Sequence, residues 1–199
     1  MPSLMETIMS QLGGDAMKKL GGQLGTDEKT TGAATGAAVT TLLGALSRNA
    51  SGQAGAESLS NALSKDHDGG VLDDLSGFLN NPQIGNGDGV LKHVLGNRRG
   101  AVEKGIGSVS GLGAGKAGQL LSTLAPIVMG VLGKQQRQQG LNASSLAGLL
   151  GQERDSIERQ QPAAKGILSS LLDTDRDGDV DMGDLAKHGA RLLGKFLGK

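Results

Sequence analysis

Six aspartates near the end of the chain have the spacing of a calcium-binding loop. Residues 173–184 read DTDRDGDVDMGD. Calcium binds six to eight oxygens, and its loop pattern places ligands at positions 1, 3, 5, 7, 9 and 12, with glycine at position 6. Gly178 takes position 6, where it lets the backbone turn round the ion. The predicted calcium ligands are Asp173, Asp175, Asp177, Asp179, Asp181 and Asp184.

The aspartates have different roles in this loop. Asp179 contributes through its backbone carbonyl, and Asp181 stands where a ligand often acts through water. Asp184 replaces the usual glutamate, and its shorter side chain makes bidentate binding less favourable. Without the ion the carboxylates repel one another, so we expect Ca²⁺ binding to drive local folding.

Apolar residues flank the loop at helical spacing. A helix is expected over 163–172 and another over 182–197. The whole segment resembles a single EF-hand, or one half of a dockerin. A lone EF-hand can pair through the apolar residue at loop position 8, Val180, so calcium is expected to favour self-association. The turn at 66–70 has aspartates at positions 1 and 3 but turns too early, which favours a helix cap over a metal site.

The expected helix over 182–197 is amphipathic and basic. Its polar side carries Lys187, Arg191, Lys195 and Lys199. Such a helix can lie on an anionic membrane or dock on a partner, but more often it packs on its own core. The apolar side carries Leu185, Leu192, Leu193, Phe196 and Leu197.

Composition limits the other possibilities. The 199 residues include 35 glycines, two phenylalanines and no cysteine, tryptophan or tyrosine, so a core must be aliphatic and thiolate chemistry is excluded. Lys plus Arg equals Asp plus Glu at 20 each, so no net charge attracts nucleic acid. No signal peptide is evident, and the longest apolar stretch, 120–132, falls short of the roughly 20 residues that span a bilayer. We therefore expect a soluble, cytoplasmic protein, with export by a signal-free route left open.

Almost every periodic segment predicts a helix, so the expected fold class is all-α. Residues 30–47 align with 116–133 at an offset of 86, and a one-residue slippage aligns the helices that follow. We interpret this as two repeated helical units, about 10–65 and 94–152, around a glycine-rich insert at 66–93. The expected helices are 4–12, 15–24, 30–47, 55–64, 71–79, 89–95, 99–106, 114–136 and 143–151, followed by the two helices of the calcium segment.

Two features inside these helices have structural interpretations. The segment 113–118 fits GxGxxG, but no strand precedes it, so its glycines more plausibly end one helix and start the next. Pro126 lies inside a long helix, where it frees a carbonyl and is expected to serve packing.

Two segments carry a family resemblance. Gly87–Gly96 with Arg99–Glu103, and the long helix with Leu124–Gly130, resemble the YidB-like bacterial family of unknown function. The resemblance covers roughly 1–152 and implies an all-helical fold without an established activity. The expected organisation is this domain at 1–152, a linker at 153–162 and the EF-hand-like module at 163–199.

The leading hypothesis is a non-enzymatic, calcium-binding interaction or assembly protein that self-associates or binds a protein partner, with no small-molecule substrate. One alternative is DNA binding through short helix-turn-helix-like units, with Arg98, Arg99, Lys104 and Lys116 on phosphates. A second is membrane-surface binding through the basic C-terminal helix. A third is a hydrolase that uses the paired carboxylates Asp73 and Asp74.

Overall fold

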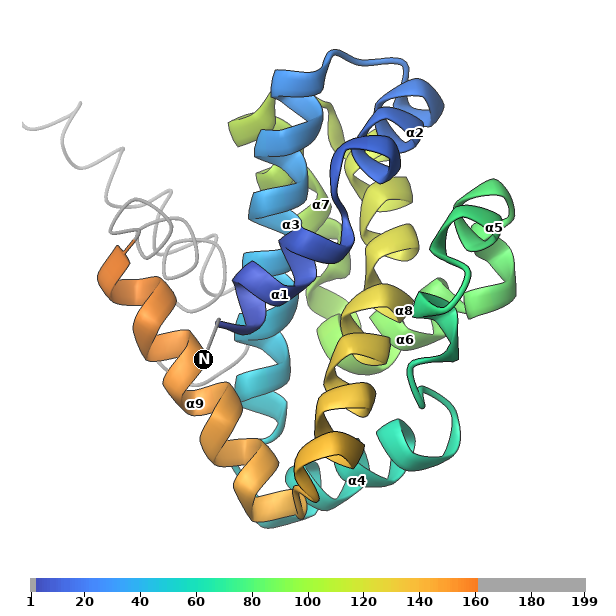
Figure 1. The fold of residues 1–199 in the computed structure, drawn as a ribbon. Coiled ribbons are helices and arrows are strands. Elements are labelled where there is room, and N and C mark those ends of the chain that lie inside the picture. Colours follow the sequence, from blue (N-terminus) through green and yellow to red (C-terminus); the bar gives the residue numbers. More distant parts are fainter. Residues whose placement is uncertain (1–2, 161–199) are drawn as a thin grey trace, which may run out of the picture.

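The computed structural model describes residues 3–160, and this part of the chain contains nine α-helices, three short 3-10 helices and no strand (Figure 1). The predicted all-α fold is therefore confirmed for these residues. In chain order the elements are α1 (Leu4–Gln11), α2 (Gly14–Leu24), α3 (Glu28–Asn49), α4 (Gln53–Lys65), η1 (Gly70–Leu72), α5 (Leu75–Asn80), η2 (Pro82–Gly85), α6 (Gly87–Leu95), η3 (Gly96–Arg98), α7 (Arg99–Ser110), α8 (Ala114–Gln139) and α9 (Ala143–Gln160).

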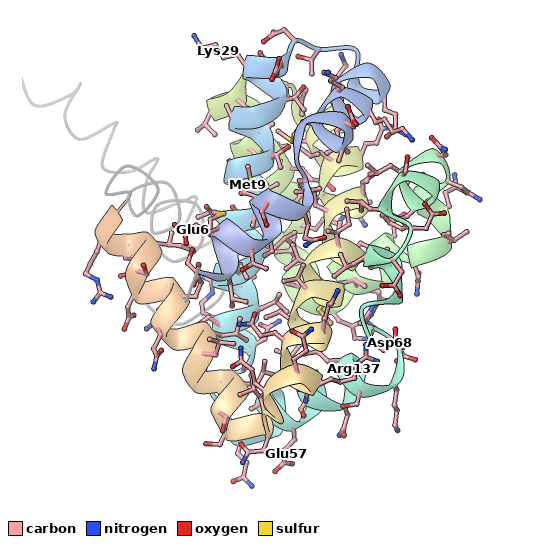
Figure 2. All side chains as sticks on the ribbon, viewed as in Figure 1. Glu6, Met9, Lys29, Glu57, Asp68 and Arg137 are labelled. Atoms are coloured by element: carbon pink, nitrogen blue, oxygen red, sulfur yellow. The ribbon has the colours of Figure 1, made fainter. Side chains whose placement is uncertain are left out.

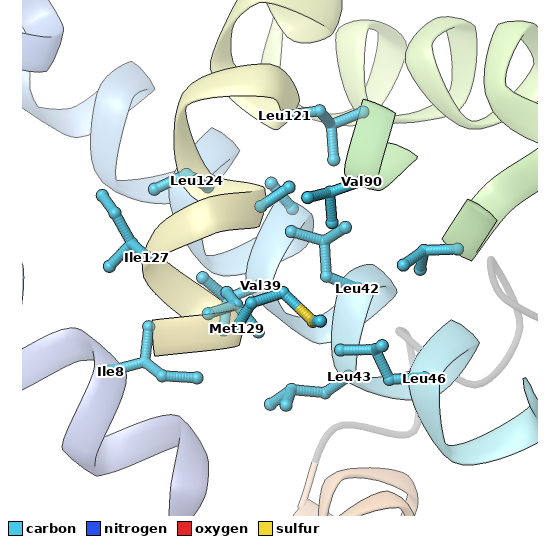
Figure 3. Close-up of a cluster of buried hydrophobic side chains, with 14 of the residues drawn as sticks. Ile8, Val39, Leu42, Leu43, Leu46, Val90, Leu121, Leu124, Ile127 and Met129 are labelled. Carbon is cyan, nitrogen blue, oxygen red and sulfur yellow. The ribbon is translucent and has the colours of Figure 1, made fainter. Parts of the chain in front are cut away.

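The two longest helices, α3 and α8, pack against each other at the centre of the fold. Their contact is aliphatic, as the composition predicts, and Figure 3 shows Val39, Leu42 and Leu43 of α3 beside Leu124 and Met129 of α8. All five side chains are buried. Most of the remaining helices pack on this pair, whereas α5 contacts α2, η1 and η2.

The chain has the same order of helices on both sides of the insert. A short helix, a long helix and a helix of intermediate length follow one another in α2–α3–α4 and again in α7–α8–α9. Gly25 and Gly111 end α2 and α7 with positive φ angles of 58° and 75°, a conformation that glycine adopts without strain. In both cases the N-cap position of the next long helix lies two residues later, at Asp27 for α3 and at Gly113 for α8, although only Asp27 caps with its side chain. Of the GxGxxG segment, Gly113 is the N-cap residue of α8, and Gly115 and Gly118 lie inside that helix. The segment therefore starts a helix, as predicted, but the preceding helix is ended by Gly111, just before the segment.

The helix bounds differ by more than the expected one-residue slippage after the long helices. Helix α8 has 26 residues and α3 has 22, so α8 is one turn longer. As a result α9 begins at Ala143, 90 residues after α4 begins at Gln53. The packing is nevertheless reciprocal, because α3 contacts α7 and α9 while α8 contacts α2 and α4.

Helix α9 is longer than predicted. It was expected to end at 151 and give way to a linker, but it continues to Gln160. The reason is the spacing of Leu146, Leu150, Glu153 and Ile157, all of which are buried on one face of the helix. The polar run between these positions hid the periodicity.

Glu153 joins the first and last described helices. Its side chain is 6% exposed, and its two carboxylate oxygens accept hydrogen bonds from the amides of Leu4 and Met5 at 3.0 and 2.9 Å. These amides lie in the first turn of α1 and have no acceptor within the helix. Figure 1 shows the start of α1 beside α9. A side chain from α9 therefore caps α1.

Among the described residues, α8 is long and apolar enough by length and composition to cross a membrane. However, 78% of the apolar window is buried inside the domain, as in the core helix of a protein that does not span a membrane.

Candidate functional site

The glycine-rich insert packs on α8 because α8 presents glycines to it. A Cβ atom at Gly130 would lie 2.6 Å from Val71 Cγ1, and one at Gly133 would overlap the carbonyl oxygen of His67. The segment from His67 to Val71 therefore lies closer to the α8 backbone than any larger residue would allow. This close contact fixes one wall of a groove.

Pro126 fixes the neighbouring part of the insert. Proline lacks an N–H, so the carbonyl of Ser122, four residues earlier, receives no helical hydrogen bond. Gly87 of α6 packs against this carbonyl, and a Cβ atom there would overlap the oxygen. Gly85 packs on the proline ring, where a Cβ would lie 2.8 Å from Pro126 Cγ. The prediction that Pro126 serves packing is thus consistent with its contacts.

Between α4, the insert and the centre of α8 the surface is hollowed by a groove of about 1210 Å³. Helix α4 forms one wall, and η1, α5, η2 and α6 form the other. Three residues that line the groove, Leu46, Val90 and Met129, are labelled among the buried side chains of Figure 3. The apolar side chains of the floor and walls are Leu46, Leu59, Phe78, Val90, Val94, Pro126 and Met129.

The edge of the groove carries an uncovered apolar residue. Ile84 lines the groove and is 70% exposed, and only one other large apolar residue in the described part of the chain, Val109, is comparably exposed. Single exposed apolar residues are common, but one that continues a buried apolar floor extends a binding surface. The groove therefore offers a continuous apolar surface from the core to the rim.

The charged groups that line the groove are acidic. Asp66, Asp68 and Asp74 line it, and no lysine or arginine does. Asp74 Oδ1 caps α5 by accepting the amide hydrogen of Gly77 at 2.8 Å. Asp68 Oδ1 accepts the amide hydrogen of Gly70, and Oδ2 lies 3.2 Å from Arg137 Nη1 (Figure 2). The Gly70 hydrogen bond, followed by Arg137, holds the pKa of Asp68 below its ordinary value.

Two histidines lie in the groove as well. His67 is partly buried, and this desolvation lowers the pKa of its ring below 6.5, although the nearby Asp66 acts in the opposite direction. His93 is exposed, and its Nδ1 contacts the carbonyl oxygen of Gly89 at 2.8 Å, one turn earlier in α6. His93 is thus held against its own helix.

The predicted calcium ligands Asp173, Asp175, Asp177, Asp179, Asp181 and Asp184 lie outside the described residues. Within residues 3–160 no three His, Asp or Glu side chains gather as a metal site would require. At the 66–70 turn, Asp68 binds Gly70 and Arg137, which agrees with the capping interpretation.

The residues proposed for other activities have structural partners. Arg99 lies 2.6 Å from Asp88 and 2.7 Å from Glu103, and the Glu103 hydrogen bond is the main reason that the pKa of Arg99 is raised. Lys116 Nζ donates a hydrogen bond to the carbonyl oxygen of Gly25. Asp74, one of the two carboxylates considered for a hydrolase, accepts the amide hydrogen of Gly77 and so caps α5. Arg99 and Lys116 are thus engaged inside the domain.

Asp88 links α6 to α8. It lies in the first turn of α6 and accepts a hydrogen bond from Ser122 Oγ at 2.8 Å. This bond and the one from Arg99 lower the pKa of Asp88. Asp88, Arg99 and Ser122 thereby join α6, α7 and α8.

Sequence reasoning did not predict the groove. Its walls come from segments far apart in the chain, and no periodicity within one segment indicates how two segments will be spaced. One signal was present: Ile84 is an isolated apolar residue in the turn-forming run NNPQIGNGDG, where nothing in the local pattern buries it.

Residues 3–160 define an all-helical domain that carries an apolar groove. The family model described as a bacterial protein of unknown function (DUF937) matches residues 6–135. The chain belongs to this family. No curated protein and no solved structure matched it. The resemblance to a bacterial family of unknown function is confirmed at that level, while the YidB-like and EF-hand resemblances remain predictions.

Proposed function

We propose that this protein is a non-enzymatic interaction protein that binds a protein segment in the groove and calcium in its C-terminal region. The observation that carries the proposal is the groove itself, with its apolar floor and the exposed Ile84 on its rim. Grooves of this kind accept amphipathic helices, whose apolar residues recur every three or four positions. The polar residues at the edge, such as Asp68 and Asp74, already hold helix caps and turns.

The calcium module of the proposal rests on the sequence of residues 173–184. In this proposal Asp173, Asp175, Asp177 and Asp184 bind the ion through side chains, Asp179 through its carbonyl and Asp181 through water. The helical domain then extends to Gln160, and the EF-hand-like module occupies 163–199. The shared order of helices and the matched caps at Gly25 and Gly111 support a duplicated helical unit within the domain.

Calorimetric titration with calcium tests this module on the intact protein. We expect one site per chain, and we expect Asp173→Ala to remove or strongly weaken it because the first ligand of the loop is lost. Asp155→Ala is the matched control, since Asp155 lies on the surface of α9 outside the loop and should leave binding unchanged. Absence of heat in the natural sequence, or equal binding by Asp173→Ala, would show that the loop does not hold calcium.

Self-association is the partner interaction that the calcium loop favours, because a lone EF-hand can pair through Val180. Sedimentation of the full chain in calcium and in chelator measures it. We expect a higher mass in calcium, and an unchanged mass would refute calcium-driven pairing.

A further inference from the structure

We propose that the groove between α4 and the insert is occupied by the chain's own basic C-terminal segment, residues 185–199. This inference rests on the proposed function, because it identifies the protein segment that the groove binds. The segment carries Leu185, Leu192 and Phe196 at the i, i+7, i+11 spacing of one helical face. That is the pattern that helix-binding grooves select.

Charge complementarity favours this segment over others in the chain. Residues 185–199 contain four lysines or arginines and no aspartate or glutamate. The charged groups that line the groove are the three carboxylates of Asp66, Asp68 and Asp74, without a lysine or arginine. Asp68 also pairs with Arg137 at 3.2 Å, so Asp66 and Asp74 supply most of the negative charge. A basic helix with an apolar face therefore matches both the floor and the edge of the groove, whereas an acidic helix would be repelled.

The intervening chain is long enough. Helix α9 ends at Gln160, so residues 161–184 connect it to the docking segment. These residues reach about 80 Å when extended. A helix over 163–172, as the sequence predicts, shortens this by about 18 Å. A domain of this size is about 40 Å across, so the segment can reach any face of it.

The segment itself needs a surface. An isolated helix of about 15 residues is marginal in water, and each interior glycine costs about 1 kcal/mol more relative to alanine. Residues 185–199 include Gly189, Gly194 and Gly198 alongside five large apolar side chains. Burying those side chains in the groove would stabilise the helix and cover Ile84 together.

A nitroxide label on the full-length protein tests the docking. Because the chain has no cysteine, Gly198→Cys gives a single labelling position. We expect the label to abolish the methyl NMR signals of Ile84 and Met129, which line the groove, and to spare Met17 in α2. Chemical reduction of the nitroxide should restore both signals.

Variants in the segment separate docking from chance proximity. Phe196→Ala, or Arg191→Glu combined with Lys195→Glu, should restore the Ile84 and Met129 signals in the labelled protein. Lys29→Glu is the matched control, because Lys29 is exposed at the start of α3 and lies far from Asp68 in Figure 2. Since the segment variants lie outside the helical domain, unchanged Met17 signals will show that the domain is folded.

Three outcomes would overturn the proposal. The labelled protein could keep the Ile84 and Met129 signals in both calcium and chelator, or it could lose the Met17 signal in their place. The third outcome is that the groove signals are lost only when the label lies on a separate chain. The last is read from a mixture in which one chain carries the nitroxide and another carries the isotope. The calcium titration is measured separately, so a chain that binds calcium but leaves the groove signals intact overturns the docking alone.

Discussion

At the scale of single residues, Pro126 and Gly87 act together at one point on α8. The proline frees the carbonyl of Ser122, and the missing side chain of Gly87 lets α6 pack against it. The proline's effect on its own helix was predictable from its position, but its partner was not. Gly87 and Pro126 are far apart in sequence, and only the packed fold brings them together.

Substitution of Gly87 by alanine should destabilise the domain by about 1–3 kcal/mol or more, because the added methyl group would overlap the Ser122 carbonyl and displace backbone. Urea unfolding measures the change. Gly22→Ala is the control: Gly22 is exposed inside α2 with no neighbouring atom near the added Cβ, so alanine should stabilise by about 0.5–1 kcal/mol. Equal effects of the two substitutions would show that α6 does not depend on close contact at Gly87.

At the scale of elements, α1 depends on α9. A carboxylate that accepts two amides at a helix start satisfies donors that would otherwise lack partners and interacts favourably with the helix dipole. Sequence patterns identify caps within three residues of a helix start, such as Ser3 and Glu6 of α1. They do not identify a cap 149 positions away, which explains why Glu153 was assigned to a linker.

Glu153→Gln should reduce stability by about 1–3 kcal/mol, because an amide has one acceptor oxygen and its NH₂ group opposes the second backbone donor. Denaturant unfolding measures this loss, and hydrogen exchange should show faster exchange at the amides of Leu4 and Met5. Asp155→Asn on the same helix is the control, since the 3.2 Å pair of Asp155 with Arg154 lies at the surface and contributes less than about 0.5 kcal/mol. If both variants lose the same stability, the cap has no special role.

The elements were more predictable than their arrangement. Glycines at helix ends and an aliphatic 3.6-residue period indicated the helices from α1 to α8, apart from the details of the insert. The end of α9 was missed because Arg154, Asp155 and Glu158 surround the two buried positions. To predict the groove, one would have to know that segment 67–71 packs against the glycines of α8. The pattern of residues along the sequence does not contain that information.

At the scale of the whole molecule, three aspartates make the free energy of unfolding depend on pH in the acidic range. Hydrogen bonds lower the folded pKa values of Asp27, Asp68 and Asp88 below 3.8, chiefly from Thr30, Gly70 and Ser122 respectively. A lowered folded pKa means that the stabilisation is present above the unfolded pKa and is lost as the pH falls through the folded pKa. The domain should therefore lose stability below about pH 4.

The contribution of Asp88 can be isolated. Asp88→Asn should lower the free energy of unfolding at pH 7 by about 1 kcal/mol or less, because its pair with Arg99 is largely exposed. The difference from the natural sequence should shrink toward zero as the pH falls below the folded pKa of Asp88, since the carboxyl is then neutral in both states. Urea unfolding across pH measures it, with the fully exposed Asp15→Asn as control. A difference that persists unchanged in acid would contradict an ionic origin.

The cap from Glu153 has a consequence during synthesis. Helix α1 is synthesised before the other described helices, yet the residue that caps its first turn is made 149 positions later. Until α9 is synthesised, α1 lacks the cap from Glu153 and can pack only on α3 and α8 as they form. Helices α1 and α9 therefore become fixed to each other in one step. Truncation before Glu153 would remove the cap of α1 together with the end of α9.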